Sequence, residues 1–343
     1  MIFQEFHSQR GCMSYLVGCD AERVVALVDP SLDLLGDYRG ALASNGWRLS
    51  HLIDTHTHAD HFSAVRQLAA ELSVPAVQHS SCRGDFVDLA VDDGETLVVG
   101  QQRIRIMHTP GHTGDSICLV LEDRVLTGDT LLLGACGRTD FPGGDAAALY
   151  DSLFNHLLKL DGSLLVYPGH NYKQKPTTTL EVQIRENPRL QQKTEEAFVA
   201  QMDALKLDLP DHLTEALRTN ITGGKTVETL IRDAARSIAF VSRAELNARI
   251  ESGDGSMVVL DVRERDAFAQ GHIPGAVNVP RGQLELRADT MFPNPTVRIV
   301  PYCDFGKIST LATATLREMG FFRAVALDGG FDSWRQDGYR FES

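Results

Sequence analysis

The chain has 343 residues, more than one ordinary hydrophobic core holds, so the length predicts two domains. Its formal net charge of −13 argues against general nucleic-acid binding, which uses a basic surface. No apolar run approaches the roughly 18 residues of a membrane span. The N-terminus lacks a basic segment followed by an apolar core, so we expect neither a membrane anchor nor a secretory signal.

The cysteines indicate the compartment. They stand at positions 12, 19, 82, 118, 136 and 303 and form neither a CxxC motif nor a regular framework. In a chain of this size that pattern predicts free thiols in a reducing compartment, and we expect a cytoplasmic protein.

The first half of the chain predicts strands and short helices punctuated by glycine. Apolar and alternating patterns predict strands at residues 23–28, 49–54, 103–108, 116–121 and 124–127, and a helix at 65–72. From about 180 to 217 the pattern is helical and charged. A Thr-Gly-Gly-Lys segment at 222–225 predicts a linker, and one more helical stretch reaches about 238. We therefore place the first domain at 1–238.

The remaining residues, 239–343, predict a second domain. Helices are expected at 244–250 and 307–319, where Gly320 is a natural C-cap, and strands at 257–260 and 299–302. Strands that alternate with helices predict a small α/β domain with a parallel sheet.

Histidines and aspartates cluster at predicted strand ends in the first domain. The segment His56-x-His58-x-Asp60-His61 follows an apolar strand, and three further residues each follow a glycine, namely His112, Asp129 and His170. Seven imidazole and carboxylate groups from four loops predict a metal centre.

The order of these motifs resembles the metallo-β-lactamase superfamily, in its glyoxalase II branch, over roughly residues 1–190. The resemblance implies an α/β fold, an αββα sandwich. In the hydrolases of this superfamily such a set holds two metals. The first would be bound by His56, His58 and His112, and the second by Asp60, His61 and His170, with Asp129 bridging. The ligand set alone therefore does not separate a two-metal hydrolase from a one-iron oxygenase.

Three other segments resemble the persulfide dioxygenases, namely Gly134–Phe141 (GACGRTDF), Tyr167–Tyr172 (YPGHNY) and Asn187–Leu190 (NPRL). This resemblance implies one Fe(II) per chain, bound by His56, His112 and Asp129, the two-His-one-carboxylate arrangement of oxygen-activating iron. The residues that would surround this site are His58, Asp60, His61 and His170. The resemblance also implies that Tyr172 and Arg189 contact glutathione. We expect Arg138 to brace its loop and Cys136 to be a packed thiol.

The second domain contains motifs that resemble a rhodanese, namely Leu260–Glu264 (LDVRE), Gly271–Ala276 (GHIPGA), Tyr302–Lys307 (YCDFGK) and Asp328–Phe331 (DGGF) followed by Trp334. Cys303 lies between a strand and a helix, where loop N–H groups and the helix N-terminus favour a thiolate or a persulfide. The loop comprises Asp304, Phe305, Gly306, Lys307, Ile308 and Ser309. Because Lys307 is its only cation and Asp304 is acidic, glutathione persulfide is as plausible a sulfur donor as thiosulfate. We expect His272 to be structural.

Together these patterns predict an iron persulfide dioxygenase that oxidises glutathione persulfide with O₂ and water to sulfite and glutathione. The rhodanese domain would transfer sulfur through Cys303 between glutathione persulfide or glutathione and sulfite or thiosulfate. One alternative is a two-zinc hydrolase of glutathione thioesters with an accessory rhodanese domain. Another is a non-catalytic, sulfur-responsive binding module. We expect no nucleic acid and no membrane as partners. The direction of sulfur flow and the oligomeric state stay open, a homodimer being one option.

Overall fold

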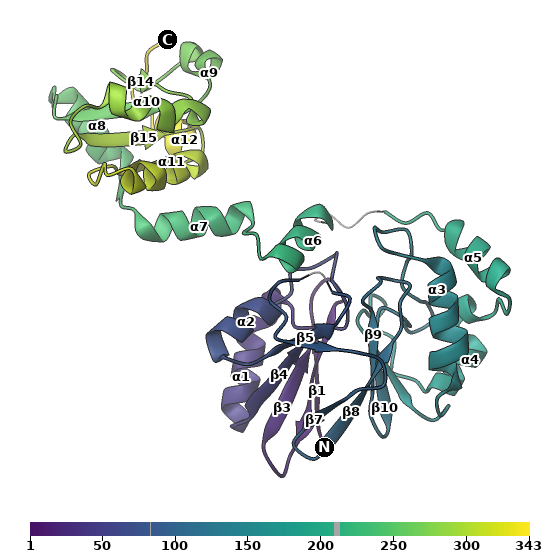
Figure 1. Cartoon of the computed structure of the whole chain (residues 1–343). Helices are drawn as coiled ribbons and strands as arrows, with labels where there is room; N and C mark the ends of the chain where they lie inside the picture. The colour runs from purple at the N-terminus through teal and green to yellow at the C-terminus, as the bar shows by residue number, and fades with distance from the viewer. Residues whose placement is uncertain (83, 209–212) are drawn as a thin grey trace. The chain divides into compact units, whose positions relative to one another are not determined.

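A computed structural model describes residues 1–82, 84–208 and 213–343. The chain divides into two compact units, residues 1–224 and 225–343, which are labelled by element in Figure 1. The division lies earlier than the expected boundary at residue 238. The helix between the two positions, α7 (Val227–Ser237), packs against α11 (Lys307–Glu318) of the second unit, so it belongs to that unit.

The first unit contains two mixed sheets. Their strands are β1 (Ile2–His7), β2 (Met13–Cys19), β3 (Val24–Val28), β4 (Arg48–Ile53), β5 (Ala76–His79), β6 (Leu89–Val91), β7 (Thr96–Val99), β8 (Gln102–His108), β9 (Ile117–Val120), β10 (Arg124–Gly128) and β11 (Leu165–Pro168). The strand order is β1-β2-β3-β4-β5-β6 in one sheet and β11-β10-β9-β8-β7 in the other. The five predicted strands correspond to β3, β4, β8, β9 and β10.

Helices cover the outer faces of both sheets (Figure 1). They are α1 (Leu35–Asn45) and α2 (Val65–Leu72) on the first sheet, and α3 (Ala146–Asp151), α4 (Leu180–Glu186) and α5 (Glu195–Asp203) on the second, followed by α6 (Leu213–Thr222). The charged stretch from 180 is therefore several short helices. Asn187 ends α4 with an extended backbone because Pro188 follows it.

The alternation of side chains along the strands explains how one sheet contributes to two layers of the core. On β3, Val24, Ala26 and Val28 point into the core between the two sheets, whereas Val25 and Leu27 point toward α1 and α2. Successive side chains of a strand face opposite sides, so a strand that is apolar throughout can serve both layers. The predicted αββα sandwich is confirmed.

The second unit is built on parallel strands, as predicted. A three-stranded sheet has the order β14-β13-β15, and β12 pairs with β16 in parallel. Its strands are β12 (Phe240–Val241), β13 (Met257–Asp261), β14 (Val277–Asn278), β15 (Arg298–Tyr302) and β16 (Ala326–Leu327). Besides α7 and α11, its helices are α8 (Arg243–Glu251), α9 (Arg265–Gln270), α10 (Leu284–Met291) and α12 (Gly330–Gln336).

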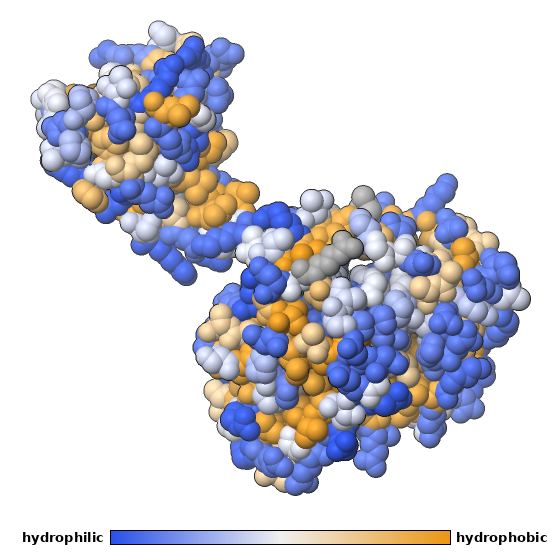
Figure 2. Space-filling view, viewed as in Figure 1, coloured by the Kyte–Doolittle hydropathy of each residue, from blue (hydrophilic) through white to orange (hydrophobic). Residues whose placement is uncertain are grey.

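The surface is mixed in character. Hydrophilic side chains cover much of each unit on the face drawn in Figure 2, with apolar side chains between them. Among the described residues, no helix has the length and apolarity needed to cross a membrane.

Candidate metal centre

The three predicted iron ligands lie together. His56 follows β4, His112 lies between β8 and β9, and Asp129 directly follows β10. All three are buried, and one ligand atom from each lies within 4.8 Å of the other two. The His112 Nε2 atom is 3.6 Å from Asp129 Oδ2. Three separate loops thus converge on a space the size of one metal ion.

Hydrogen bonds prepare His56 to bind a metal. The Thr55 hydroxyl donates to Asp29 Oδ2 at 2.8 Å, so its oxygen accepts from His56 Nδ1 at 3.0 Å. This fixes the tautomer and leaves a lone pair on His56 Nε2, which is buried and has no hydrogen-bond partner among the described residues. Burial, together with the charge of His58, holds the pKa of His56 well below its usual value. His56 is therefore a neutral imidazole, the form that binds metal.

The other two ligands are also held from behind. His112 Nδ1 donates to the Arg138 carbonyl at 2.7 Å, and Asp129 Oδ1 accepts from His170 Nδ1 at 2.7 Å. Metal ligands are commonly oriented by such contacts. The donor set, the unpartnered Nε2 atom and these supports fit one iron ion.

His170 bridges two carboxylates. Its Nδ1 atom donates to Asp129 and its Nε2 atom donates to Asp60 Oδ2 at 2.6 Å. Burial lowers the pKa of His170, but the two carboxylates outweigh burial and raise it well above its usual value. Burial raises the pKa of Asp129, and the charge and hydrogen bond of His170 outweigh it and lower that pKa. In this arrangement neither nitrogen of His170 offers a lone pair to a second metal.

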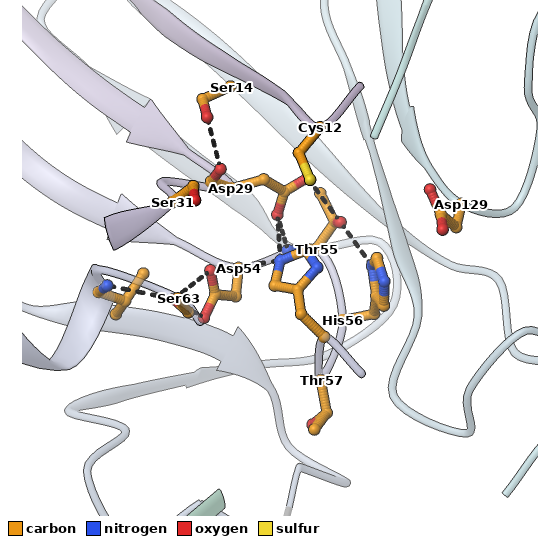
Figure 3. A network of polar contacts seen from close by, with 12 residues as sticks. Cys12, Ser14, Asp29, Ser31, Asp54, Thr55, His56, Thr57, Ser63 and Asp129 are labelled. Atoms are coloured by element: carbon orange, nitrogen blue, oxygen red, sulfur yellow. Dashed lines mark hydrogen bonds and ion pairs between the residues drawn. The ribbon is translucent and has the colours of Figure 1, made fainter. Parts of the chain in front are cut away.

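His58 belongs to a different group of residues. Its Nε2 atom is 3.2 Å from Asp29 Oδ1 and 3.5 Å from Asp54 Oδ1. Figure 3 shows Asp29 and Asp54 on one side of His56, with Asp129 on the other. Burial lowers the pKa of His58, but the two carboxylates outweigh burial and raise it well above its usual value. His58 thus carries a charge that Asp29 and Asp54 balance.

A third group surrounds Cys12. Its sulfur, with ligand atoms of Asp60, His61 and His170, forms a cluster whose atoms lie within 4.8 Å of one another. Burial raises the pKa of Cys12, but the neighbouring His170 and His61 outweigh burial and lower it to about 6. His61 Nδ1 is 3.3 Å from Asp60 Oδ1, and the buried His61 Nε2 atom has no hydrogen-bond partner in the part of the chain that the structure describes. The four surrounding residues of the sequence prediction therefore occupy two distinct networks.

A cavity of about 590 Å³ opens onto the centre. It is lined by Arg10, Ala59, Asp60, His112, Asp129, Leu132, Cys136, Gly137, Arg138, Phe141, Tyr172, Leu207 and Asp208. The Tyr172 ring stacks on His170 at a centroid distance of 5.1 Å and is 65% exposed. Such a space accommodates a peptide-sized thiol beside the metal ligands.

Arg138 and Arg189 differ in position. The Arg138 guanidinium forms a bidentate ion pair with Asp140 and donates to the carbonyls of Leu207 and Asp208. Arg189 does not line the cavity. It is close enough to Cys136, which is a lining residue, for its charge to act on the pKa of that thiol. Burial raises the pKa of Cys136 to about 12. The contact of Arg189 with glutathione stays a prediction.

In the second unit, Cys303 lies between β15 and α11 and is 3% exposed. The Ser309 N–H group points at its sulfur at 3.4 Å, and the Ser309 hydroxyl is 3.6 Å away. The Gly330 backbone packs against this loop, where an added Cβ atom would lie 2.4 Å from the Cys303 carbonyl oxygen. The Cys303 sulfur is thus buried and is contacted by Ser309 of α11.

Asp304 forms an ion pair with an arginine that it shares with a second carboxylate. Arg263, which is buried and paired with Asp261 at 2.6 Å, also contacts Asp304 at 3.0 Å. Phe305 is 69% exposed, and Lys307 and Ile308 are also exposed. His272 donates from Nδ1 to the Phe268 carbonyl at 3.0 Å, a contact within the fold.

Comparison with known proteins identifies both units. The metallo-beta-lactamase superfamily profile matches residues 8–170, and the rhodanese-like domain profile matches residues 242–337. The mitochondrial persulfide dioxygenase ETHE1 of Bos taurus is 33% identical over 226 residues, 65% of this chain and 89% of that protein. The chain belongs to the ETHE1 persulfide dioxygenase family. The crystal structure of ETHE1 from Myxococcus xanthus is 37% identical, with a TM-score of 0.64, and covers 66% of this chain and all of that one.

A metallo-beta-lactamase structure from Staphylococcus aureus shares the fold over 96% of this chain and 98% of its own, with 22% identity and a TM-score of 0.61. Beside its ETHE1-like unit, this chain carries a rhodanese-like domain over residues 242–337.

Sequence reasoning missed Cys12, Asp29 and Asp54 at the site. For Asp29 a signal was present, since an acidic residue directly followed the predicted strand at 23–28.

Proposed function

We propose that the first unit oxidises glutathione persulfide with O₂ and water to sulfite and glutathione. The observation that carries the proposal is the separation of the seven candidate ligands. The ligand atoms of His56, His112 and Asp129 lie close enough together to bind one metal ion. By contrast, both nitrogens of His170 are hydrogen-bonded to carboxylates, and His58 forms ion pairs with Asp29 and Asp54. When bound by the three residues, Fe(II) would supply redox chemistry and open positions for the persulfide sulfur and O₂.

The residues of the chain have distinct parts in this reaction. Thr55, the Arg138 carbonyl and His170 orient the three ligands. Tyr172 provides an aromatic wall of the cavity in which we place the thiol. Asp60 lines the same cavity and is bonded to His170, so this pair offers a path for protons released from water.

We infer that Cys303 carries sulfane sulfur in the second unit. The Cys303 thiolate would attack the outer sulfur of glutathione persulfide, releasing glutathione and forming a Cys303 persulfide. Sulfite would then attack the outer sulfur of that persulfide, forming thiosulfate and restoring the thiolate. The Ser309 N–H group, 3.4 Å from the sulfur, is placed to stabilise the anion in both states.

Metal analysis and oxygen uptake test the proposal. The wild-type protein should hold about one iron per chain and consume O₂ when given glutathione persulfide. Asp129→Ala should lose iron and oxygen uptake together. Two zinc ions per chain with thioester hydrolysis and no oxygen uptake would instead establish the hydrolase. Full turnover by Asp129→Ala would exclude this ligand assignment.

A further inference from the structure

The cavity at the candidate metal centre is lined by Arg10, a cation with no ion pair in the described part of the chain. Among its ionised lining residues, Asp129 is in the metal group, Asp60 is bonded to His170, and Arg138 is bonded to Asp140. The Arg10 side chain is exposed and has no ion pair or side-chain hydrogen bond within residues 1–82, 84–208 and 213–343. Arg10 thus lines the cavity with a guanidinium group that has no ionic partner among the residues that the structure describes.

A tight turn holds Arg10 in this position. The Ser8 N–H group donates to the Cys12 carbonyl at 2.9 Å, and the Ser8 hydroxyl accepts from the N–H groups of Arg10 at 3.3 Å and Cys12 at 2.9 Å. Gly11 has a φ of +86°, which glycine adopts without strain. These hydrogen bonds therefore fix the backbone of the turn that carries Arg10.

The same turn is attached to the wall of the cavity. The Asn171 N–H group donates to the Gly11 carbonyl at 2.8 Å, and a Cβ atom added to Gly11 would lie 2.9 Å from the Tyr172 ring. Arg10 and Tyr172 are consequently adjacent at the entrance. A thiol that packs on Tyr172 would have the Arg10 guanidinium within reach.

We propose that Arg10 binds a carboxylate of the thiol that carries the sulfane sulfur, and so makes the site selective for persulfides of carboxylate-bearing thiols. The inference rests on the proposed dioxygenase function and names the group that sets its substrate class. A guanidinium binds a carboxylate through two parallel hydrogen bonds. The net charge of −13 opposes the approach of an anionic substrate, and a cation that lines the cavity offsets this repulsion locally.

Other charges near the cavity are less suited to this task. Asp208 also lines the cavity, and its negative charge opposes non-specific binding of anions there. The Arg138 guanidinium is already bonded to Asp140 and two carbonyls, and Arg189 does not line the cavity. Lys173 and Lys175 line a smaller cavity of about 100 Å³ that shares Tyr172.

The test compares two substrates that differ only in carboxylates, namely glutathione persulfide and the persulfide of glutathione diethyl ester. Arg10→Ala should raise KM for glutathione persulfide about tenfold, with kcat and iron content unchanged. KM for the ester should be the same in Arg10→Ala and the wild type. Arg10→Lys should recover part of the loss. Calorimetric binding of glutathione and of its diethyl ester should follow the same pattern without turnover.

Arg103→Ala is the matched control, since Arg103 is an exposed arginine on β8 that does not line the cavity. It should change neither KM. A KM for glutathione persulfide in Arg10→Ala within twofold of the wild type would overturn the inference. So would an equal rise for both substrates, because Arg10 would then only shape the turn. A larger effect of Arg189→Ala or Lys175→Ala would assign the carboxylate to those residues. Absence of oxygen uptake in the wild type would instead refute the dioxygenase function.

Discussion

Replacement of Asp29 by asparagine should weaken both the fold and the metal site. Asp29 is 2% exposed and accepts from the Thr55 N–H group at 2.6 Å, the Thr55 hydroxyl at 2.8 Å and His58 Nε2 at 3.2 Å. The amide has nearly the same volume but no charge and only one accepting oxygen. In Asp29→Asn, Asp54 is therefore the one remaining carboxylate of this pair to balance the charge of His58, at 3.5 Å.

The size of the effect follows from these contacts. Removing one partner of a buried ion pair costs about 3–5 kcal/mol. Because Asp54 remains, we expect the lower end, and about 3 kcal/mol corresponds to a fall in Tm of about 6–12 °C for a unit of this size. Loss of a residue that orients a metal ligand lowers metal affinity about 10- to 100-fold. Asp29 affects iron binding through two hydrogen bonds, one from the Thr55 hydroxyl to Asp29 and one from His56 Nδ1 to the oxygen of that hydroxyl.

Two measurements check this expectation, thermal unfolding of the metal-free protein and iron occupancy at controlled free iron. Thr55→Val is the companion variant, because it breaks the route to His56 but keeps the Asp29–His58 ion pair. It should lower iron affinity with a smaller loss of stability, about 1 kcal/mol. Thr55→Ser retains the hydroxyl and should behave as the wild type. If Asp29→Asn binds iron and unfolds as the wild type does, the supporting role of Asp29 is refuted.

Two further predictions concern separate parts of the chain. Cys303→Ser should abolish sulfur exchange between glutathione persulfide and sulfite but retain oxygen uptake from glutathione persulfide, as an oxygen electrode would record; loss of that uptake would show that Cys303 also serves the iron site. The second concerns pH. The pKa values of His58 and His170 are raised in the folded protein, so their stabilisation is complete below the unfolded value, about 6.5, and is lost as pH rises through the folded values. The Tm of the metal-free protein should therefore fall as the pH rises above about 6.5, and His58→Gln should flatten that dependence; an unchanged slope would contradict the assignment.

The sequence determined the two-domain organisation, the strands that carry the site and the identity of the candidate ligands. These features depend on local periodicity and on motifs of neighbouring residues. Each can therefore be recognised within a short segment of the sequence. Cys303 is an example, because its strand, loop and helix are continuous in sequence.

The resemblance implied different roles for His56 and His58, and the tertiary structure supplies the physical reason for the difference. The two stand two residues apart after one strand, and nothing local distinguishes them as ligands. Parallel pairing of β3 with β4 places Val28 opposite Ile53, and so brings Asp29 beside Asp54 and Thr55. The carboxylates then bind His58, while the Thr55 hydroxyl holds His56 Nδ1 and His56 groups with His112 and Asp129. Such a choice depends on contacts between distant segments, which no pattern along the chain records.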